Sequence, residues 1–98
     1  MRPSAAFNKH REAIRKLVES GEFLLANPRV FGSALHGTDT PKSDLDLLVD
    51  AFPDTTLMDI YGLEEELERL LKVPVHVLTT RGLPEKFKGK ILAEACPV

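Results

Sequence analysis

Cysteine is almost absent from this sequence, since Cys96 is the only one among 98 residues. A single cysteine excludes an internal disulfide, and sparse cysteine is typical of proteins that stay in a reducing compartment. Long apolar runs are also missing, because none approaches the roughly 18 residues that a membrane-spanning helix needs. The N-terminal stretch MRPSAAFNKHREAIRK lacks the apolar centre of a signal peptide. Together these absences predict a cytoplasmic protein.

An excess of positive charge is absent as well. The 13 Lys and Arg residues and 15 Asp and Glu residues give a net charge of −2, which argues against general nucleic-acid binding through a basic surface. The acidic residues are concentrated, because the segment from Asp39 to Glu68 contains ten of them and one basic residue, Lys42. Such segments are usually solvated surfaces, but they also form sites for divalent cations.

The length and composition predict one small folded domain that spans residues 1–98. Hydrophobic residues make up 43% of the chain and charged residues 29%, which supports a packed core. A core of this size is thin, so a partner chain is expected to cover part of the apolar surface. No internal repeat or low-complexity segment stands out.

The hydrophobic pattern predicts an α/β or α+β fold, in which helices flank a small mixed sheet. A capping box is expected where Thr56 precedes Asp59 by three residues, at the start of the clearest helix. The expected helices lie at residues 4–19, 57–71 and 83–95, and the expected strands at residues 29–31, 44–49 and 73–78.

The second strand begins with two carboxylates that packing does not explain. Residues two apart in a strand point to the same side, so Asp44 and Asp46 share one face while Leu45 and Leu47 share the other. The two carboxylates repel one another unless a cation lies between them, and carboxylate oxygens suit Mg²⁺. Solvated aspartates at an exposed strand start are the alternative interpretation.

A Gly-Ser turn precedes the aspartates. Gly32 lets the backbone approach a ligand closely, and Ser33 adds a hydroxyl and a backbone N–H at a possible helix start. Gly32 and Gly37 have the spacing of a P-loop, but Thr38 and Asp39 stand where a Lys-Ser/Thr pair is required. This excludes an ATPase of the P-loop type.

The combined motif is more specific than its parts. Gly32-Ser33, ten further residues and Asp44-Leu45-Asp46 resemble the signature of nucleotidyltransferases related to DNA polymerase β. The segments FGSALHG and PKSDLDLLVD most closely resemble those of the minimal nucleotidyltransferase (MNT) family, and the similarity extends over essentially the whole chain. The resemblance implies that Gly32 and Ser33 bind the phosphates of ATP and that Asp44 and Asp46 bind two Mg²⁺ ions. The implied reaction is transfer of a nucleotidyl group with release of pyrophosphate.

Two positions depart from the family pattern. The family usually has a carboxylate on the next strand, where VPVHVL offers His76. A neutral imidazole can accept a proton from the attacking hydroxyl, although it is a poorer Mg²⁺ ligand than a carboxylate; a purely structural role for His76 is the alternative. His36 stands where the family often has arginine, and it is either a weak phosphate ligand or a solvated loop residue.

The remaining acidic residues have ordinary explanations. Asp59 caps a helix, Asp54 belongs to a turn, Glu64–Glu66 line a solvated helical face, and Asp50 lies outside the metal site. Lys42 and Ser43 are interpreted as loop residues.

The resemblance also implies a partner. Stand-alone MNT proteins are typically paired with a HEPN-domain toxin, which they neutralise by adding AMP to a tyrosine near its active site. The sequence therefore suggests an ATP-dependent protein adenylyltransferase that acts as an antitoxin, with catalytic residues Asp44, Asp46 and His76. The alternative is a catalytically degenerate module that masks its HEPN partner by binding alone.

Overall fold

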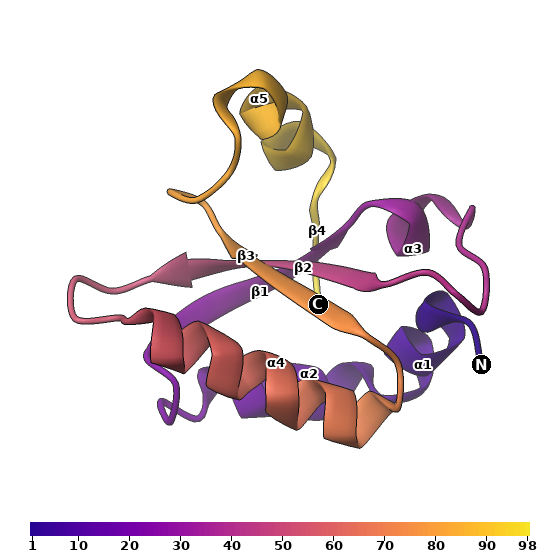
Figure 1. Cartoon of the computed structure of the whole chain (residues 1–98), viewed down its shortest axis with the longest axis horizontal. Coiled ribbons are helices and arrows are strands. Elements are labelled where there is room, and N and C mark those ends of the chain that lie inside the picture. Colours follow the sequence, from indigo (N-terminus) through magenta and orange to yellow (C-terminus); the bar gives the residue numbers. More distant parts are fainter.

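A computed structural model describes all 98 residues, and one four-stranded sheet lies at its centre in the order β3-β2-β1-β4. β2 runs parallel to β3 and antiparallel to β1, and β1 is antiparallel to β4, so the sheet is mixed. With the helices that flank it, this sheet confirms the predicted fold class (Figure 1). The strands are β1 (Leu25–Phe31), β2 (Leu45–Ala51), β3 (Val75–Thr79) and β4 (Cys96–Pro97).

Five helices surround the sheet, three of them on one face. In Figure 1, α1, α2 and α4 lie below the sheet, whereas α5 stands off its upper side and α3 follows the end of β1. No helix combines the length and the apolar character that crossing a membrane requires. The helices are α1 (Pro3–Lys9), α2 (Arg11–Glu19), α3 (Ser33–His36), α4 (Leu57–Leu71) and α5 (Glu85–Glu94).

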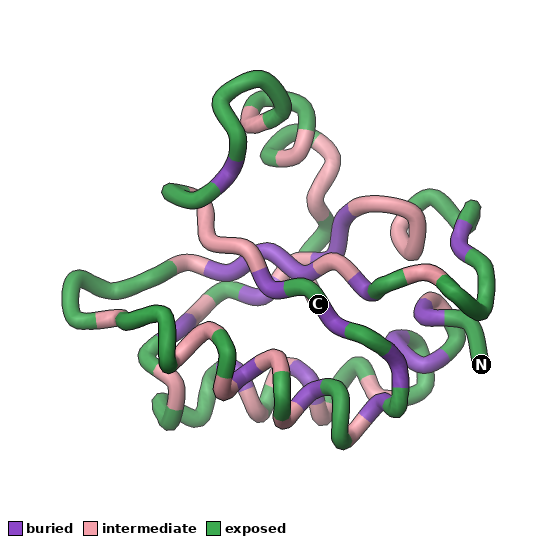
Figure 2. Tube along the Cα trace, in the orientation of Figure 1, coloured by how far each residue is buried: buried purple, intermediate pink, exposed green.

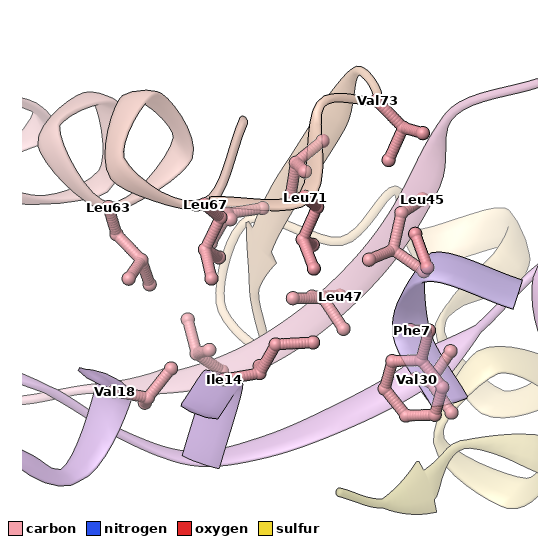
Figure 3. Packing of buried hydrophobic residues seen from close by; sticks show 14 of the residues in the cluster. Phe7, Ile14, Val18, Val30, Leu45, Leu47, Leu63, Leu67, Leu71 and Val73 are labelled. Atoms are coloured by element: carbon pink, nitrogen blue, oxygen red, sulfur yellow. The ribbon is translucent and has the colours of Figure 1, made fainter. Parts of the chain in front are cut away.

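The main core lies between the sheet and the three helices below it. Leu63 and Leu67 of α4, four residues apart and therefore on one helical face, are fully buried and point toward Leu47 of β2 and Ile14 of α2 (Figure 3). Burying a leucine side chain of this size stabilises the fold by about 1.5–3 kcal/mol. Buried positions follow the sheet and these helical faces, whereas α5 has none (Figure 2).

α4 has the predicted bounds and the predicted capping box. The Asp59 N–H donates to the Thr56 hydroxyl oxygen, and the Thr56 N–H donates to the Asp59 carboxylate. The two bonds satisfy backbone donors that a helix start otherwise leaves free. The helix ends at Lys72, which adopts a left-handed conformation with φ of 58°. Asp54 lies in the turn before this helix, as expected.

The expected single helix over residues 4–19 is wrong, because two helices occupy this segment. His10 separates α1 from α2 with φ of −114° and ψ of 20°. Phe7 of α1 and Ile14 and Val18 of α2 still reach the same core.

β1 begins four residues earlier than predicted. Asn27 and Pro28 indicate a turn by composition, but the structure places them inside the strand, where the register with β2 shifts between Ala26 and Arg29. Asn27 has φ of 55°, and the irregularity accommodates a proline that a regular central ladder excludes.

The other strand limits differ by smaller amounts. β2 starts at Leu45 rather than at Asp44, and β3 covers 75–79 rather than 73–78. The two-residue β4 was not predicted, because so short a segment shows no strand pattern. It pairs with Arg29 and Val30 of β1.

Glu64 does not lie on a purely solvated face. Its carboxylate accepts the Val77 N–H at 2.7 Å, and Glu68 accepts the Val75 N–H at 2.9 Å. β3 is an edge strand, so its outward backbone N–H groups have no neighbouring strand to bind. The two glutamates of α4 accept from these donors, which could otherwise pair with a strand of another molecule. Glu65 and Glu66 behave as predicted and pair with Arg69 on the surface.

Candidate active site

The site begins at Gly32, where β1 ends and α3 begins. Gly32 has φ of 76° and ψ of −155°, a combination that side-chain-bearing residues rarely adopt. A Cβ built at this position would lie 2.4 Å from Oδ2 of Asp46. Because glycine has no side chain, the turn can lie directly against Asp46. Ser33 follows as the first residue of α3.

Asp46 occupies the centre of the site. On β2 it lies in register between Phe31 of β1 and His76 of β3. Its side chain is 26% exposed, on the side of the sheet opposite to the main core. Burial raises the pKa of the Asp46 carboxyl; the adjacent His76 lowers it and the negative charge of Asp44 raises it again. The ionised form of Asp46 is therefore less stable here than in water, chiefly because the carboxyl group is partly removed from solvent.

Asp44 and His76 flank this carboxylate. Asp44 is exposed and lies immediately before β2, close enough for its charge to act on Asp46. His76 Nδ1 lies 3.8 Å from Asp46 Oδ1, and the imidazole is 57% exposed. The parallel pairing of β2 with β3 thus places His76 beside the carboxylate, at the position expected for the third catalytic group.

The donors at this site fit a divalent cation that takes further ligands from elsewhere. No group of three or more His, Cys, Asp or Glu side chains is close enough to hold a metal ion by itself. Two neighbouring carboxylates are nevertheless the donors that Mg²⁺ uses when waters and phosphates complete its shell. Asp44 and Asp46 would hold it.

The remaining candidates lie outside this cluster. Desolvation alone would raise the pKa of Asp50, but hydrogen bonds from Asn27 and Thr80, each at 3.0 Å, and from Arg29 at 2.6 Å lower it. His36 Nε2 lies 3.1 Å from Glu94 Oε2, so its contact is with α5. Ser43 bonds to Thr40 within the loop, which agrees with its interpretation as a loop residue.

A groove opens beside His76. It has a volume of about 320 Å³ and lies between α4 and the free edge of β3. Leu57 and Tyr61 of α4 line it and are 64% and 57% exposed. The helical spacing placed Leu57 among the apolar positions of this helix, which is equally typical of core residues, and no sequence signal marked Tyr61.

Asp39 is a further residue that the sequence analysis did not single out. It is 2% exposed, accepts the Ser4 N–H at 2.8 Å and pairs with Arg2 at 3.3 Å. The hydrogen bond from Ser4 lowers the pKa of Asp39 in spite of its burial. This aspartate anchors the loop to α1 and is structural.

Comparison with known proteins identifies the class. The chain belongs to the nucleotidyltransferase domain family, whose model matches residues 8–98. A relative that carries a protein adenylyltransferase name, MJ0435 of Methanocaldococcus jannaschii, is 36% identical over 69 residues, which cover 70% of this chain and 74% of the relative. Within the family, this protein belongs to the minimal nucleotidyltransferases. A solved structure described as a minimal nucleotidyltransferase has 36% identity and a TM-score of 0.83, and the match covers 97% of this chain and 95% of that one.

A more distant structure shares the fold. It is a toxin–antitoxin crystal structure with AMP-PNP, 22% identical, and it matches with a TM-score of 0.75 over 88% of this chain and 69% of that chain.

Proposed function

We propose that this protein is a metal-dependent adenylyltransferase that transfers AMP from ATP to a hydroxyl of a HEPN-domain protein, and so acts as the antitoxin of a toxin–antitoxin pair. The observation that carries the proposal is the meeting of Gly32, Asp46 and His76 at one point, with Asp44 beside them. The name of the relative MJ0435 supports adenylyl transfer to protein.

In this reaction the acceptor oxygen attacks the α-phosphorus of ATP. A new P–O bond forms, the bond from the α-phosphorus to pyrophosphate breaks, and the acceptor hydroxyl loses its proton. Gly32 lets the phosphates approach the backbone, and Ser33 offers its hydroxyl and N–H to them. Mg²⁺ bound by Asp44 and Asp46 would supply positive charge that neutralises the phosphates and the oxygens that exchange places.

His76 is the candidate for the group that takes the acceptor's proton. Its imidazole is largely exposed and lies at 3.8 Å from Asp46, so an acceptor can approach it from the groove. A neutral imidazole has one free lone pair for this proton.

The groove beside His76 supports a protein as the acceptor. Two of the most exposed large apolar side chains, Leu57 and Tyr61, line it from the first turns of α4. Apolar patches of this kind are typical of protein contact sites. The AMP-PNP-bound toxin–antitoxin structure has the same fold, and the MNT resemblance implies a HEPN domain as the toxin. We place the pair in the cytoplasm, where the exposed thiol of Cys96 would stay reduced.

A second candidate function is a binding module that masks the HEPN partner without catalysis. The observation that favours it is His76, because the imidazole replaces a carboxylate that would bind the metal better.

Two measurements test the proposal. Titration of the protein with ATP should show binding that requires Mg²⁺, and Asp46→Asn should abolish it. Asp54→Asn, in an exposed turn, is the matched control and should bind as the wild type does. Labelled AMP should then appear on a purified HEPN-domain protein that is incubated with this protein and Mg²⁺-ATP. Inhibition of that partner at equal stoichiometry without any AMP transfer would establish the binding module instead.

A further inference from the structure

We propose that the cleft between α5 and the Gly-Ser turn is the second half of the nucleotide site, in which Phe87 stacks on the base and Lys90 binds the phosphates. This inference rests on the proposed function, because it takes a nucleoside triphosphate as the ligand. α5 contributes no residue to the transfer reaction itself, and the proposal gives this helix a role in binding the nucleotide.

The cleft adjoins the candidate active site directly. It has a volume of about 270 Å³, and Gly32, which touches Asp46, lines it together with His36. Small-molecule sites usually measure about 300–1,000 Å³. The cleft is thus large enough for part of a nucleotide whose phosphates extend toward Asp46.

The opposite wall is one face of α5. Phe87, Lys90 and Glu94 line the cleft at helical spacing, so they lie on the same side of the helix. Phe87 is 49% exposed, and no residue of α5 is buried. A helix that contributes so little to the core still presents an aromatic ring and a cation to the cleft, and these are the groups that recognise a base and a phosphate.

Lys90 is the only lysine or arginine that lines the cleft. The other basic group there, His36, is paired with Glu94 at 3.1 Å. Lys86 and Lys88 lie on the same helix but outside the cleft. A triphosphate carries several negative charges, so Lys90 is the residue of this wall that can balance them at neutral pH.

α5 is fixed to the rest of the chain near both of its ends. At its C-terminal end the pair between His36 and Glu94 joins it to α3, and Ile91 and Ala95 pack on a small cluster that contains Phe31. Just before its first residue, Leu83 is buried in the same cluster. Phe87 and Lys90 therefore stand on a wall that is held in place beside the cleft.

Calorimetric titration with Mg²⁺-ATP and with Mg²⁺-tripolyphosphate separates the two roles. Because stacking on an aromatic ring is worth about 1–3 kcal/mol per base, Phe87→Leu should weaken ATP binding by roughly 5- to 150-fold. It should leave tripolyphosphate binding unchanged, and Phe87→Tyr should retain ATP binding. Lys90→Ala should weaken both ligands by a similar factor, about tenfold.

Matched controls lie on the same helix. Leu92→Ala and Lys88→Ala remove an apolar and a basic side chain outside the cleft, and both should bind ATP as the wild type does. Equal affinities for Phe87→Leu and Leu92→Ala, or for Lys90→Ala and Lys88→Ala, would overturn the inference. A loss of tripolyphosphate binding in Phe87→Leu would also overturn it. If the wild type binds no Mg²⁺-ATP, the proposed function itself fails.

Discussion

At the scale of single residues, the contact between Gly32 and Asp46 decides the geometry of the site. The turn can lie against the carboxylate only because no Cβ stands between them and because the backbone has a positive φ. Position 32 therefore requires glycine for two separate reasons: a side chain would collide with Asp46, and the backbone conformation is unfavourable for other residues. Substitutions at two glycines can separate them.

Gly32→Ala should lower the free energy of unfolding and abolish Mg²⁺-dependent ATP binding. The new methyl group meets the Asp46 carboxylate at 2.4 Å, in addition to the strain of φ at 76°. Gly37→Ala is the control, since Gly37 has φ of 73° and open space around it. It should lose only the backbone contribution, about 1–3 kcal/mol, and keep ATP binding. Urea unfolding and calorimetry check both variants, and equal effects would mean that the contact with Asp46 is unimportant.

His76 gives the prediction that separates catalysis from masking. His76→Ala should reduce AMP transfer by about 10²–10⁴-fold if the imidazole accepts the proton, while the affinity for the partner stays the same. His76→Asp restores a third carboxylate and should raise transfer, because carboxylate oxygen suits Mg²⁺ better. Labelled AMP incorporation measures both variants. Equal transfer by wild type and His76→Ala would make His76 structural.

The sequence predicted that Gly32, Asp46 and His76 lie close together, as they do in the structure, but it did not predict every contact around them. Asp44 and Asp46 could be placed on one face because strand alternation is a local rule, and the motif spacing linked them to Gly32. Asp39 could not be interpreted in the same way. Its partner Ser4 lies 35 residues away, and no local pattern records which loop reaches which helix.

At the scale of elements, the loop before β2 is held to the first helix by a buried carboxylate. Asp39 accepts the Ser4 N–H and pairs with Arg2, so that the start of α1 and the loop that carries Asp44 become one unit. The same contact gives the protein a pH dependence.

Asp39→Asn should lower the midpoint of thermal unfolding at pH 7. The pKa of Asp39 is lower in the folded state than in the unfolded chain. Its contribution to stability is therefore complete above the unfolded value, near pH 4, and is lost as the pH falls through the folded value. The difference between wild type and variant should shrink between about pH 5 and pH 3. Asp54→Asn is the control and should follow the wild type, whereas a difference independent of pH would exclude this role of the charge.

Local rules also explain which elements could be predicted. α4 was predicted with its correct bounds because its capping box and its leucine spacing agree. No local pattern marks the break at His10, and the extension of β1 through Pro28 depends on its irregular pairing with β2, which single-sequence patterns do not contain. Glu64 resembled a solvated residue because its acceptor role depends on β3 lying beside α4.

At the scale of the whole molecule, the two faces of the sheet have different tasks. The lower face carries the main core against α1, α2 and α4 (Figure 1). Asp46 and His76 alternate with core residues along β2 and β3, so they lie on the other face. The groove at the edge of β3 and the cleft under α5 contain different residues of the site, His76 and Gly32 respectively. In the proposed reaction this arrangement lets the acceptor approach from one direction and the nucleotide from another.

The groove therefore predicts where the partner protein binds. Tyr61→Ala should weaken binding of the purified HEPN protein by tenfold or more, since tyrosines in partly enclosed contact sites often contribute about 2 kcal/mol or more. Met58→Ala is the matched control, because Met58 is 77% exposed on the same helix but does not line the groove. Calorimetry with the partner measures both variants, and Mg²⁺-ATP binding should stay unchanged in each because neither residue contacts Asp44 or Asp46. If Tyr61→Ala binds the partner as Met58→Ala does, the acceptor must approach His76 from a different direction.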